Sequence, residues 1–195
     1  FFMKKFPLIL DLETKYTFRD YDDPLKLGIS VVAIYDYKRD GSEVFLEKEV
    51  NKLFPLLEES SYIIGYNIRD FDLRVLQGYY PGDIFQFAIF DILEDIKNKI
   101  GKRLALNDIL AATLNKNKTG HGLMAIDYYR EGRLEELKKY CLDDVMLTKE
   151  IFDFGVKKGE IYYPTVSGKG TIKIDWKKYL QEDGNGGDIS MTLPF

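Results

Sequence analysis

Carboxylate side chains stand beside apolar segments at separated places in this chain. Asp11 and Glu13 close the apolar run of residues 6–13, which predicts a buried strand. Because side chains alternate along a strand, both carboxylates lie on one face. Buried there, they would repel each other and lose solvation, and a divalent cation would relieve both costs. The alternative is a strand end that is open to solvent.

A second acidic position follows the short apolar run of residues 62–66, which predicts another buried strand. Asp72 falls in the first turn of the helix that we expect to begin at Phe71. Acidic residues favour helix N-termini because free backbone N–H groups point there. Helix capping alone would therefore account for Asp72, and equally for Asp70.

A third acidic position lies within the long amphipathic helix predicted for residues 134–154. Tyr140 and Asp144 are four residues apart and share one helix face, which also carries Cys141 and is expected to face the core. A buried carboxylate on that face needs a partner. The alternative is a pair of exposed aspartates, Asp143 and Asp144.

In this order and spacing, the patterns resemble the motifs of the DEDD, or DnaQ-like, superfamily of 3′→5′ exonucleases. The first motif of that superfamily is Asp-x-Glu on the first strand, and Asp11 and Glu13 match it. The second motif is an Asn followed by an aromatic–Asp pair, and Asn67 and Phe71-Asp72 match it.

The third motif is Tyr-x-x-x-Asp on a late helix, matched by Tyr140 and Asp144. The position five before Asp144 is Lys139 rather than His, so the resemblance is to the tyrosine subgroup, DEDDy. It spans about residues 8–155. Residues 106–163 also resemble ribonuclease-H-like exonuclease domains that are associated with helicases.

The resemblance implies a ribonuclease-H-like fold and two divalent ions, Mg²⁺ or Mn²⁺, which suit a set of oxygen ligands. By the same resemblance, Asp11 bridges both ions, Glu13 and Asp144 complete the first site, and Asp72 serves the second. Tyr140 is expected to orient the attacking water, because a phenol with a pKa near 10 is a poor base at neutral pH.

The expected activity is 3′→5′ exonucleolytic release of nucleotides from a single-stranded DNA or RNA end. Aromatic stacking and backbone contacts hold such ends. Neighbours of the carboxylates are the candidate substrate-binding residues: Leu12, Thr14, Asn67 and Phe71. His121 could contact phosphate or be an exposed loop residue. The same two alternatives hold for Lys116, Lys118 and Arg130, which we expect on the solvated surface.

Two other functions fit the same fold. One is a ribonuclease-H-type endonuclease, against which the tyrosine of the third motif argues. The other is a non-catalytic nucleic-acid-binding module, against which the complete set of carboxylates argues.

The elements that must position these residues predict an α/β fold with a mixed central sheet. Residues 6–13, 27–37 and 43–46 are expected to be antiparallel strands, with a hairpin turn at residues 39–42. The strand at residues 62–66 follows a helix and should run parallel to the first. Helices are predicted at residues 50–59, 71–76, 89–99, 106–114 (capped by Asn107), 123–130 and 134–154. A C-terminal hairpin is predicted at residues 161–166 and 171–176.

Composition indicates an ordinary globular domain, expected at residues 1–180 of the 195. The net charge of −4 does not indicate a protein whose whole surface binds nucleic acid. The single cysteine excludes an internal disulfide and favours a reducing compartment. No apolar run approaches a membrane span, so we expect a cytoplasmic protein.

Residues 181–195 are acidic, rich in glycine and end in Leu193-Pro194-Phe195. We expect this tail to be flexible. It resembles the acidic tails of bacterial single-stranded-DNA-binding proteins, which implies a protein partner; an inert end is the alternative.

Overall fold

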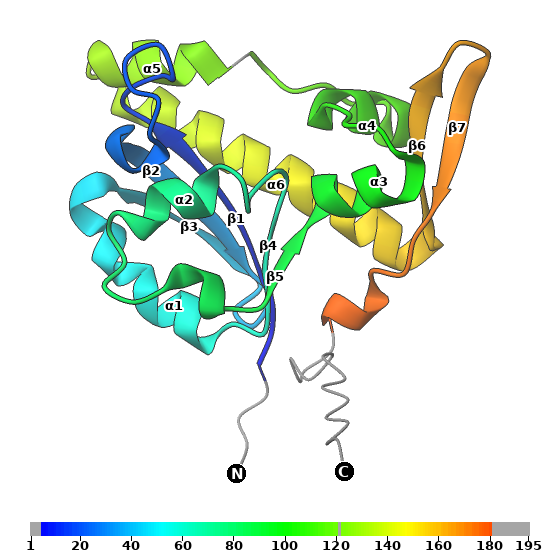
Figure 1. The fold of residues 1–195 in the computed structure, drawn as a ribbon, viewed down its shortest axis with the longest axis horizontal. Coiled ribbons are helices and arrows are strands. Elements are labelled where there is room, and N and C mark those ends of the chain that lie inside the picture. The colour runs from blue at the N-terminus through cyan, green and yellow to red at the C-terminus, as the bar shows by residue number, and fades with distance from the viewer. Residues whose placement is uncertain (1–4, 121, 181–195) are drawn as a thin grey trace, which may run out of the picture.

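The computed structural model describes residues 5–120 and 122–180. Its centre is a five-stranded sheet in the order β3-β2-β1-β4-β5 (Figure 1). The strands are β1 (Leu8–Thr14), β2 (Ile29–Asp36), β3 (Gly41–Leu46), β4 (Ile63–Gly65) and β5 (Ile89–Asp91). β1, β2 and β3 pair antiparallel, whereas β4 is parallel to β1 and to β5. This mixed α/β arrangement is compatible with the expected ribonuclease-H-like fold.

Helices cover both faces of the sheet (Figure 1). Their bounds within the described residues are α1 (Phe54–Glu59), α2 (Asp72–Gln77), α3 (Ile92–Ile100), α4 (Leu106–Leu114), α5 (Gly122–Arg130) and α6 (Leu134–Lys158). α1 and α2 pack on one face. α6 crosses the other face against β1 and β2, and α4 and α5 pack on α6.

The alternation of side chains along β1 divides the core. Leu8, Leu10 and Leu12 belong to the apolar cluster beneath α1 and α2, whereas Ile9 belongs to the cluster beneath α6. Side chains at odd positions therefore point toward α6. Asp11 shares that face, as the sequence predicted.

Residues 89–91 are a strand, and their prediction as the start of a helix is wrong. β5 pairs with β4, and Asp91 then caps α3 by accepting hydrogen bonds from the N–H groups of Leu93 and Glu94. The short strand depends on a neighbour distant in sequence, which a local helical pattern does not contain. α3 ends at Ile100, one residue after the predicted end at residue 99, and Gly101 caps it with a φ of 71°.

Other boundaries also differ from the prediction. In place of the single helix predicted at residues 50–59, the chain forms a 3₁₀-helix, Glu47–Lys52, followed by α1. Ala105 occupies the N-cap of α4, so the cap predicted for Asn107 is wrong; its side chain instead accepts a hydrogen bond from the N–H of Lys118. The hairpin strands are β6 (Glu160–Thr165) and β7 (Gly168–Lys173), with a tighter turn than expected.

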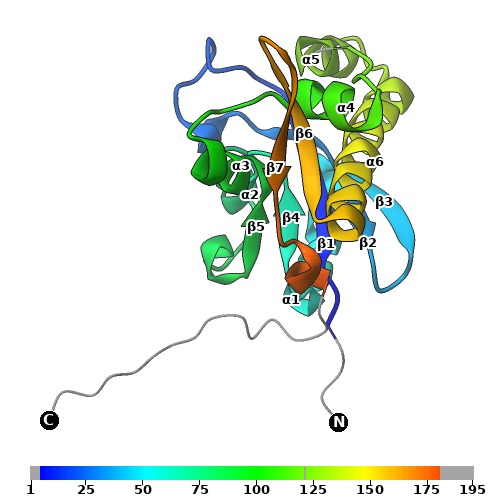
Figure 2. The same cartoon turned by 90° about the vertical axis from the view of Figure 1, so that its right-hand side faces the viewer.

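The C-terminal hairpin packs against α4 (Figure 2). A buried tryptophan, Trp176, follows it. Trp176 stacks on Phe152 of α6 with a centroid distance of 6.0 Å, and its indole N–H donates to Asp95. A Cβ at Gly155 would lie 2.4 Å from the indole ring. Glycine within α6 therefore gives Trp176 its space, and the helix continues to Lys158.

Among the described residues, the structure has no helix with both the length and the apolar character that crossing a membrane requires. The predicted tail at residues 181–195 lies outside the described residues, so its flexibility and the domain boundary at residue 180 stay predictions.

Candidate metal centre

The site forms where β1 extends beyond β4. Pairing between these strands involves only Leu8 and Ile9 of β1. The chain leaves β4 at Gly65, where a Cβ would lie 2.9 Å from the carbonyl oxygen of Leu10 and 2.7 Å from the Ile68 side chain. Glycine thus lets the turn close against β1. The N–H of Leu12, left without a strand partner, donates to Asp72 Oδ1 at 3.0 Å.

Carboxylates from the first and third motifs meet at this point. Oxygen atoms of Asp11, Glu13 and Asp144 lie within 4.8 Å of one another. Asp144 comes from α6 and is buried, whereas Asp11 and Glu13 are partly exposed. This cluster, called the carboxylate cluster below, could bind a metal ion. Asp72, which comes from α2, is buried beside this cluster and accepts the hydrogen bond from Leu12.

Burial and mutual repulsion raise the pKa values of the clustered carboxylic acids. Burial and then the charge of Asp144 raise the pKa of Asp11 from 3.8 to about 7. Burial, followed by Asp11 and Asp144, raises the pKa of Glu13 well above its usual value, and burial followed by Asp11 does so for Asp72. The anionic forms are disfavoured because desolvated like charges lie together. A cation at this point would relieve the repulsion.

Tyr140 lies beside the carboxylate cluster. Its side chain is buried, and its hydroxyl has no hydrogen-bond partner among the residues that the structure describes. Burial, then the charges of Asp144 and Glu13, raise its pKa above the usual value. The hydroxyl therefore remains protonated at neutral pH, and it can donate a hydrogen bond to a water or a substrate atom.

Cys141 contacts Asp11 from the core face of α6. The thiol is fully buried on the core face of α6, as predicted, with Sγ 3.4 Å from the carbonyl oxygen and 3.9 Å from Oδ2 of Asp11. Sulfur contacts of this kind are weak, so Cys141 contributes mainly by filling the space behind Asp11.

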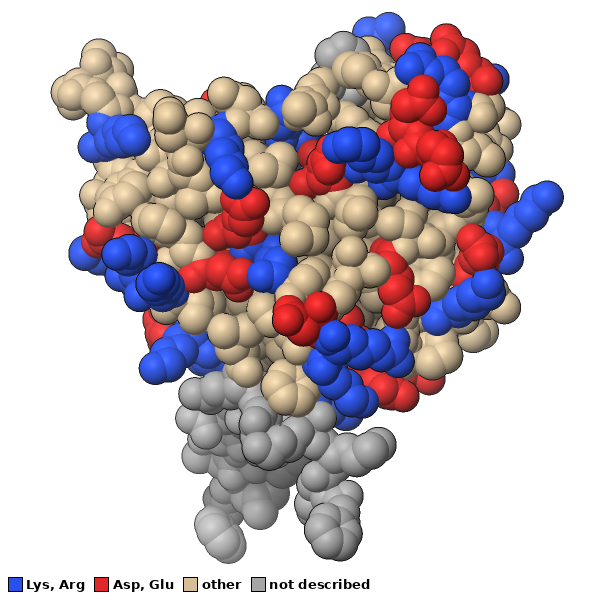
Figure 3. All heavy atoms as spheres, turned by 180° about the vertical axis from the view of Figure 1, so that it is seen from behind, with Lys and Arg blue, Asp and Glu red and all other residues tan. Residues whose placement is uncertain are grey.

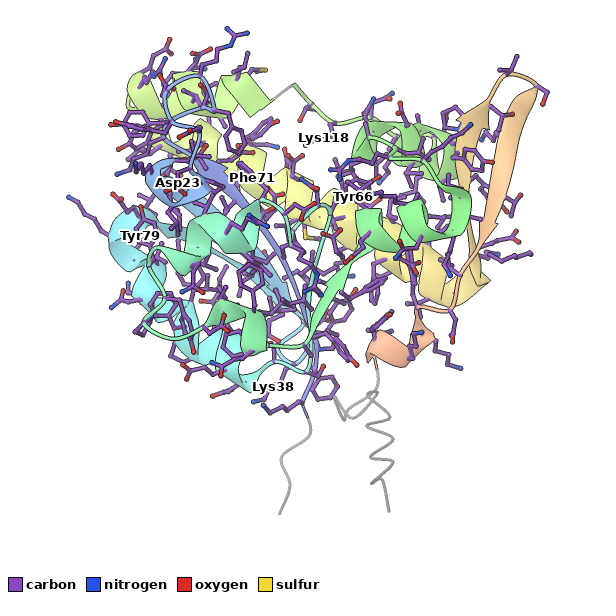
Figure 4. All side chains as sticks on the ribbon, viewed as in Figure 1. Asp23, Lys38, Tyr66, Phe71, Tyr79 and Lys118 are labelled. Atoms are coloured by element: carbon purple, nitrogen blue, oxygen red, sulfur yellow. The ribbon has the colours of Figure 1, made fainter. Side chains whose placement is uncertain are left out.

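Lys118 also belongs to the site, although its sequence context predicted a position on the solvated surface. Its Nζ lies 2.6 Å from Asp144 Oδ2, and its side chain is about one quarter exposed. Burial alone would lower its pKa, but the charges of Asp144, Asp11 and Glu13 raise it. The expectation was wrong because Lys118 lies on the connection between α4 and α5, and local sequence does not show where that connection runs (Figure 4).

Lys116 and Arg130 are on the surface, as expected. Lys116 pairs with Glu150 at 2.5 Å, and Arg130 approaches Asp20 at 3.9 Å. His121 lies outside the described residues, so its contact with phosphate stays a prediction.

Asn67 holds the turn that follows β4. It has a positive φ of 63°, and its N–H donates to Asp91, whose carboxylate also accepts from the N–H of Arg69. Arg103 donates to the Asn67 side chain at 2.7 Å. Asp91 thus fixes the turn before Asp72. The sequence does not reveal this role, because the local pattern predicts a helix at this residue.

The remaining candidates differ in exposure. Leu12 packs in the apolar core, and Thr14 is buried with its hydroxyl donating to the carbonyl of Tyr16 at 2.7 Å. Phe71 is half-buried and meets the exposed Phe18 edge to face, with ring centroids 5.8 Å apart. Contact of Leu12, Thr14, Asn67 and Phe71 with substrate stays a prediction.

Exposed aromatic rings gather on the segment that follows β1. Tyr16 and Tyr21 pack edge to face at 5.2 Å, and Phe18 has 55% of its surface exposed. We call Tyr16, Phe18, Tyr21 and Phe71 the aromatic surface.

Comparison with known proteins yields a structural similarity only. No protein-family profile matches this chain. The curated proteins likewise contain no match. A solved structure of the family B DNA polymerase from the hyperthermophilic archaeon Pyrobaculum calidifontis is similar, with a TM-score of 0.57 and 19% identity. The similarity covers 77% of this chain and 24% of the polymerase chain. The chain therefore shares its fold with about a quarter of that polymerase.

Proposed function

We propose that this protein is a metal-dependent 3′→5′ exonuclease that acts on single-stranded nucleic acid ends. The observation on which the proposal rests is the carboxylate cluster beside the buried hydroxyl of Tyr140, which has no hydrogen-bond partner among the described residues. The structural similarity to part of a DNA polymerase supports a substrate that is a nucleic acid.

The residues of the site fit a hard divalent cation. The donors are carboxylate oxygens, which favour Mg²⁺ or Mn²⁺, and their raised pKa values reflect repulsion that such a cation would relieve. In the proposal, Asp11, Glu13 and Asp144 would hold one ion, and Asp11 with Asp72 would hold a second. Bound ions of this kind make water a stronger nucleophile and stabilise a leaving oxygen.

Tyr140 orients the water that attacks the phosphodiester. Because its pKa is raised, it acts as a hydrogen-bond donor rather than as a base. Its buried hydroxyl is unpaired within residues 5–120 and 122–180, and the cost in free energy is recovered when water or substrate accepts the hydrogen bond.

The aromatic surface supports an unpaired strand as the substrate. Bases stack on exposed rings only where they are free of a complementary strand, and stacking tolerates any base. Phe71 directly precedes Asp72, and Phe18 lies against it. A base that stacks on Phe18 would therefore be held close to the carboxylates.

On the face seen from behind, Lys and Arg side chains are interspersed with Asp and Glu over the residues that the structure describes (Figure 3). A broad positive surface, which duplex-binding proteins use to contact phosphates, is not a feature of this face.

A degradation assay tests the proposal. DNA and RNA oligonucleotides with a 5′ label, single-stranded and duplex, are incubated with the protein in Mn²⁺ or in EDTA. We expect a ladder of strands shortened from the 3′ end with Mn²⁺ only, and none with Asp11→Asn. Internal fragments as first products would indicate an endonuclease. Binding without any cleavage would indicate a non-catalytic module.

A further inference from the structure

Lys118 is held against the carboxylate cluster by contacts of both its backbone and its side chain. Its N–H donates to Asn107 Oδ1 at 2.8 Å, which ties the connection to α4. Its Nζ lies 2.6 Å from Asp144 Oδ2 and 5.9 Å from the centroid of the Tyr140 ring. The ammonium is therefore directed into the site (Figure 4).

Burial distinguishes this ion pair from that of a neighbouring lysine. The side chains of Lys118 and Asp144 are 26% and 5% exposed, whereas those of Lys116 and Glu150 are 49% and 40% exposed. Exposed pairs contribute little because water screens them, and a pair shielded from water interacts more strongly. Lys116 and Lys118 thus offer a matched comparison on one short connection.

We propose that Lys118 is a built-in counter-ion of the carboxylate cluster. Without a divalent cation, its ammonium neutralises Asp144 and shields Asp11 and Glu13. A divalent cation that binds Asp144 through Oδ2 has to displace the ammonium, because two cations cannot occupy the same carboxylate oxygen without strong repulsion. This inference rests on the proposed metal centre.

The counter-ion has two opposing effects. It stabilises the folded protein before a metal ion binds, because it compensates carboxylates that would otherwise repel one another. It also weakens metal binding, because breaking the pair with Asp144 subtracts from the free energy of binding. The protein would therefore exchange one cation for another when it becomes active.

Calorimetric titration with Mn²⁺ tests the exchange. We compare wild type with Lys118→Met, which keeps the length of the side chain and removes the charge, and with Lys116→Met as the control. Lys118→Met should bind Mn²⁺ at least about tenfold more tightly, and should unfold at a lower temperature in EDTA. Lys116→Met should match wild type in both measurements. Lys118→Gln is measured in parallel, in case the Met variant does not fold.

The outcomes separate this inference from the proposed function. Wild-type Mn²⁺ binding with equal or weaker binding by both Lys118 variants would overturn the counter-ion and leave the metal centre standing. No Mn²⁺ binding by any of the proteins would overturn both. An equal gain in affinity in Lys116→Met would show a general effect of net charge, and would also overturn the specific role of Lys118.

Discussion

The N–H of Leu12 donates a hydrogen bond to Asp72 Oδ1 at 3.0 Å, so a carboxylate from α2 pairs with the free edge of β1. Asp72 therefore has a structural function beside any metal ligation. The geometry also gives a reason why the second motif follows a turn: the turn after β4 brings α2 to the edge at which β1 has lost its neighbour.

Substitutions at Asp72 should separate these two functions. Asp72→Asn keeps an acceptor oxygen for Leu12 and removes the charge, so stability in EDTA should equal or exceed that of wild type. Asp72→Ala leaves the Leu12 N–H unpaired and should be about 1 kcal/mol less stable than Asp72→Asn. Denaturant unfolding measures both, and exonuclease activity should be lost in both. Equal stability of the two variants would contradict the structural function.

The carboxylate cluster should make stability depend on pH in EDTA. The folded state raises the pKa of Asp11 to about 7, so between about pH 4 and pH 7 it binds protons that the unfolded state has released. Stability contributed by this group is present at the acidic end and is lost as pH rises through 7. Asp11→Asn should lose less stability across this window.

Thermal unfolding of wild type and Asp11→Asn at a series of pH values measures this dependence. Saturating Mg²⁺ is the control, because a bound cation should reduce the difference between the two proteins. A steeper loss in Asp11→Asn than in wild type would exclude Asp11 as the source.

Tyr140→Phe removes only the hydroxyl. If the hydroxyl orients water, single-turnover cleavage should slow by roughly 10²-fold. Stability should be equal or higher, because the buried hydroxyl has no partner among the described residues. Mn²⁺ affinity should be unchanged. Full cleavage rate in the variant would leave Tyr140 with a packing role only.

The aromatic surface can be tested by binding. Phe18→Ala should weaken the binding of a single-stranded oligonucleotide in Ca²⁺ by about tenfold, as expected for one stacked base. Phe85→Ala is the control. Phe85 is also exposed, but it lies outside the aromatic surface and lines a pocket with Leu25 and Arg74. Fluorescence anisotropy gives both affinities. Equal losses in the two variants would argue against a specific stacking role.

The C-terminal tail is proposed to contact a protein partner. A truncation after Leu180 should leave the rate on short single strands unchanged, because the carboxylate cluster lies wholly within the described residues. Co-purification of a partner with the full chain only would support the proposal. A large fall in rate on truncation would instead assign the tail a part in substrate handling.

Local periodicity predicted the parts of the site that lie on regular elements. Asp11 and Glu13 share a face because strands alternate, and Tyr140 and Asp144 share one because they are a helical turn apart. These rules depend on neighbours in sequence, so they apply before any tertiary structure is known. The family resemblance then related the two pairs to each other.

The parts that the sequence did not predict depend on distant neighbours. Lys118 reaches Asp144 because the connection between α4 and α5 passes over the site, and nothing in its local sequence distinguishes it from Lys116. Asp91 stabilises the turn before Asp72 only because β5 pairs with β4. Both contacts arise from tertiary structure, so no local pattern contains them.

The stacking of Trp176 on Phe152 gives the molecule an internal optical reporter. Trp176 is the only tryptophan, and it packs over Gly155, eleven residues along α6 from Asp144, or about 16 Å. Its emission should shift to longer wavelengths when the C-terminal hairpin separates from α6 and water reaches the indole. Cations that bind Asp144 should leave this emission unchanged, so detachment of the hairpin and occupation of the carboxylates produce distinct signals in one sample.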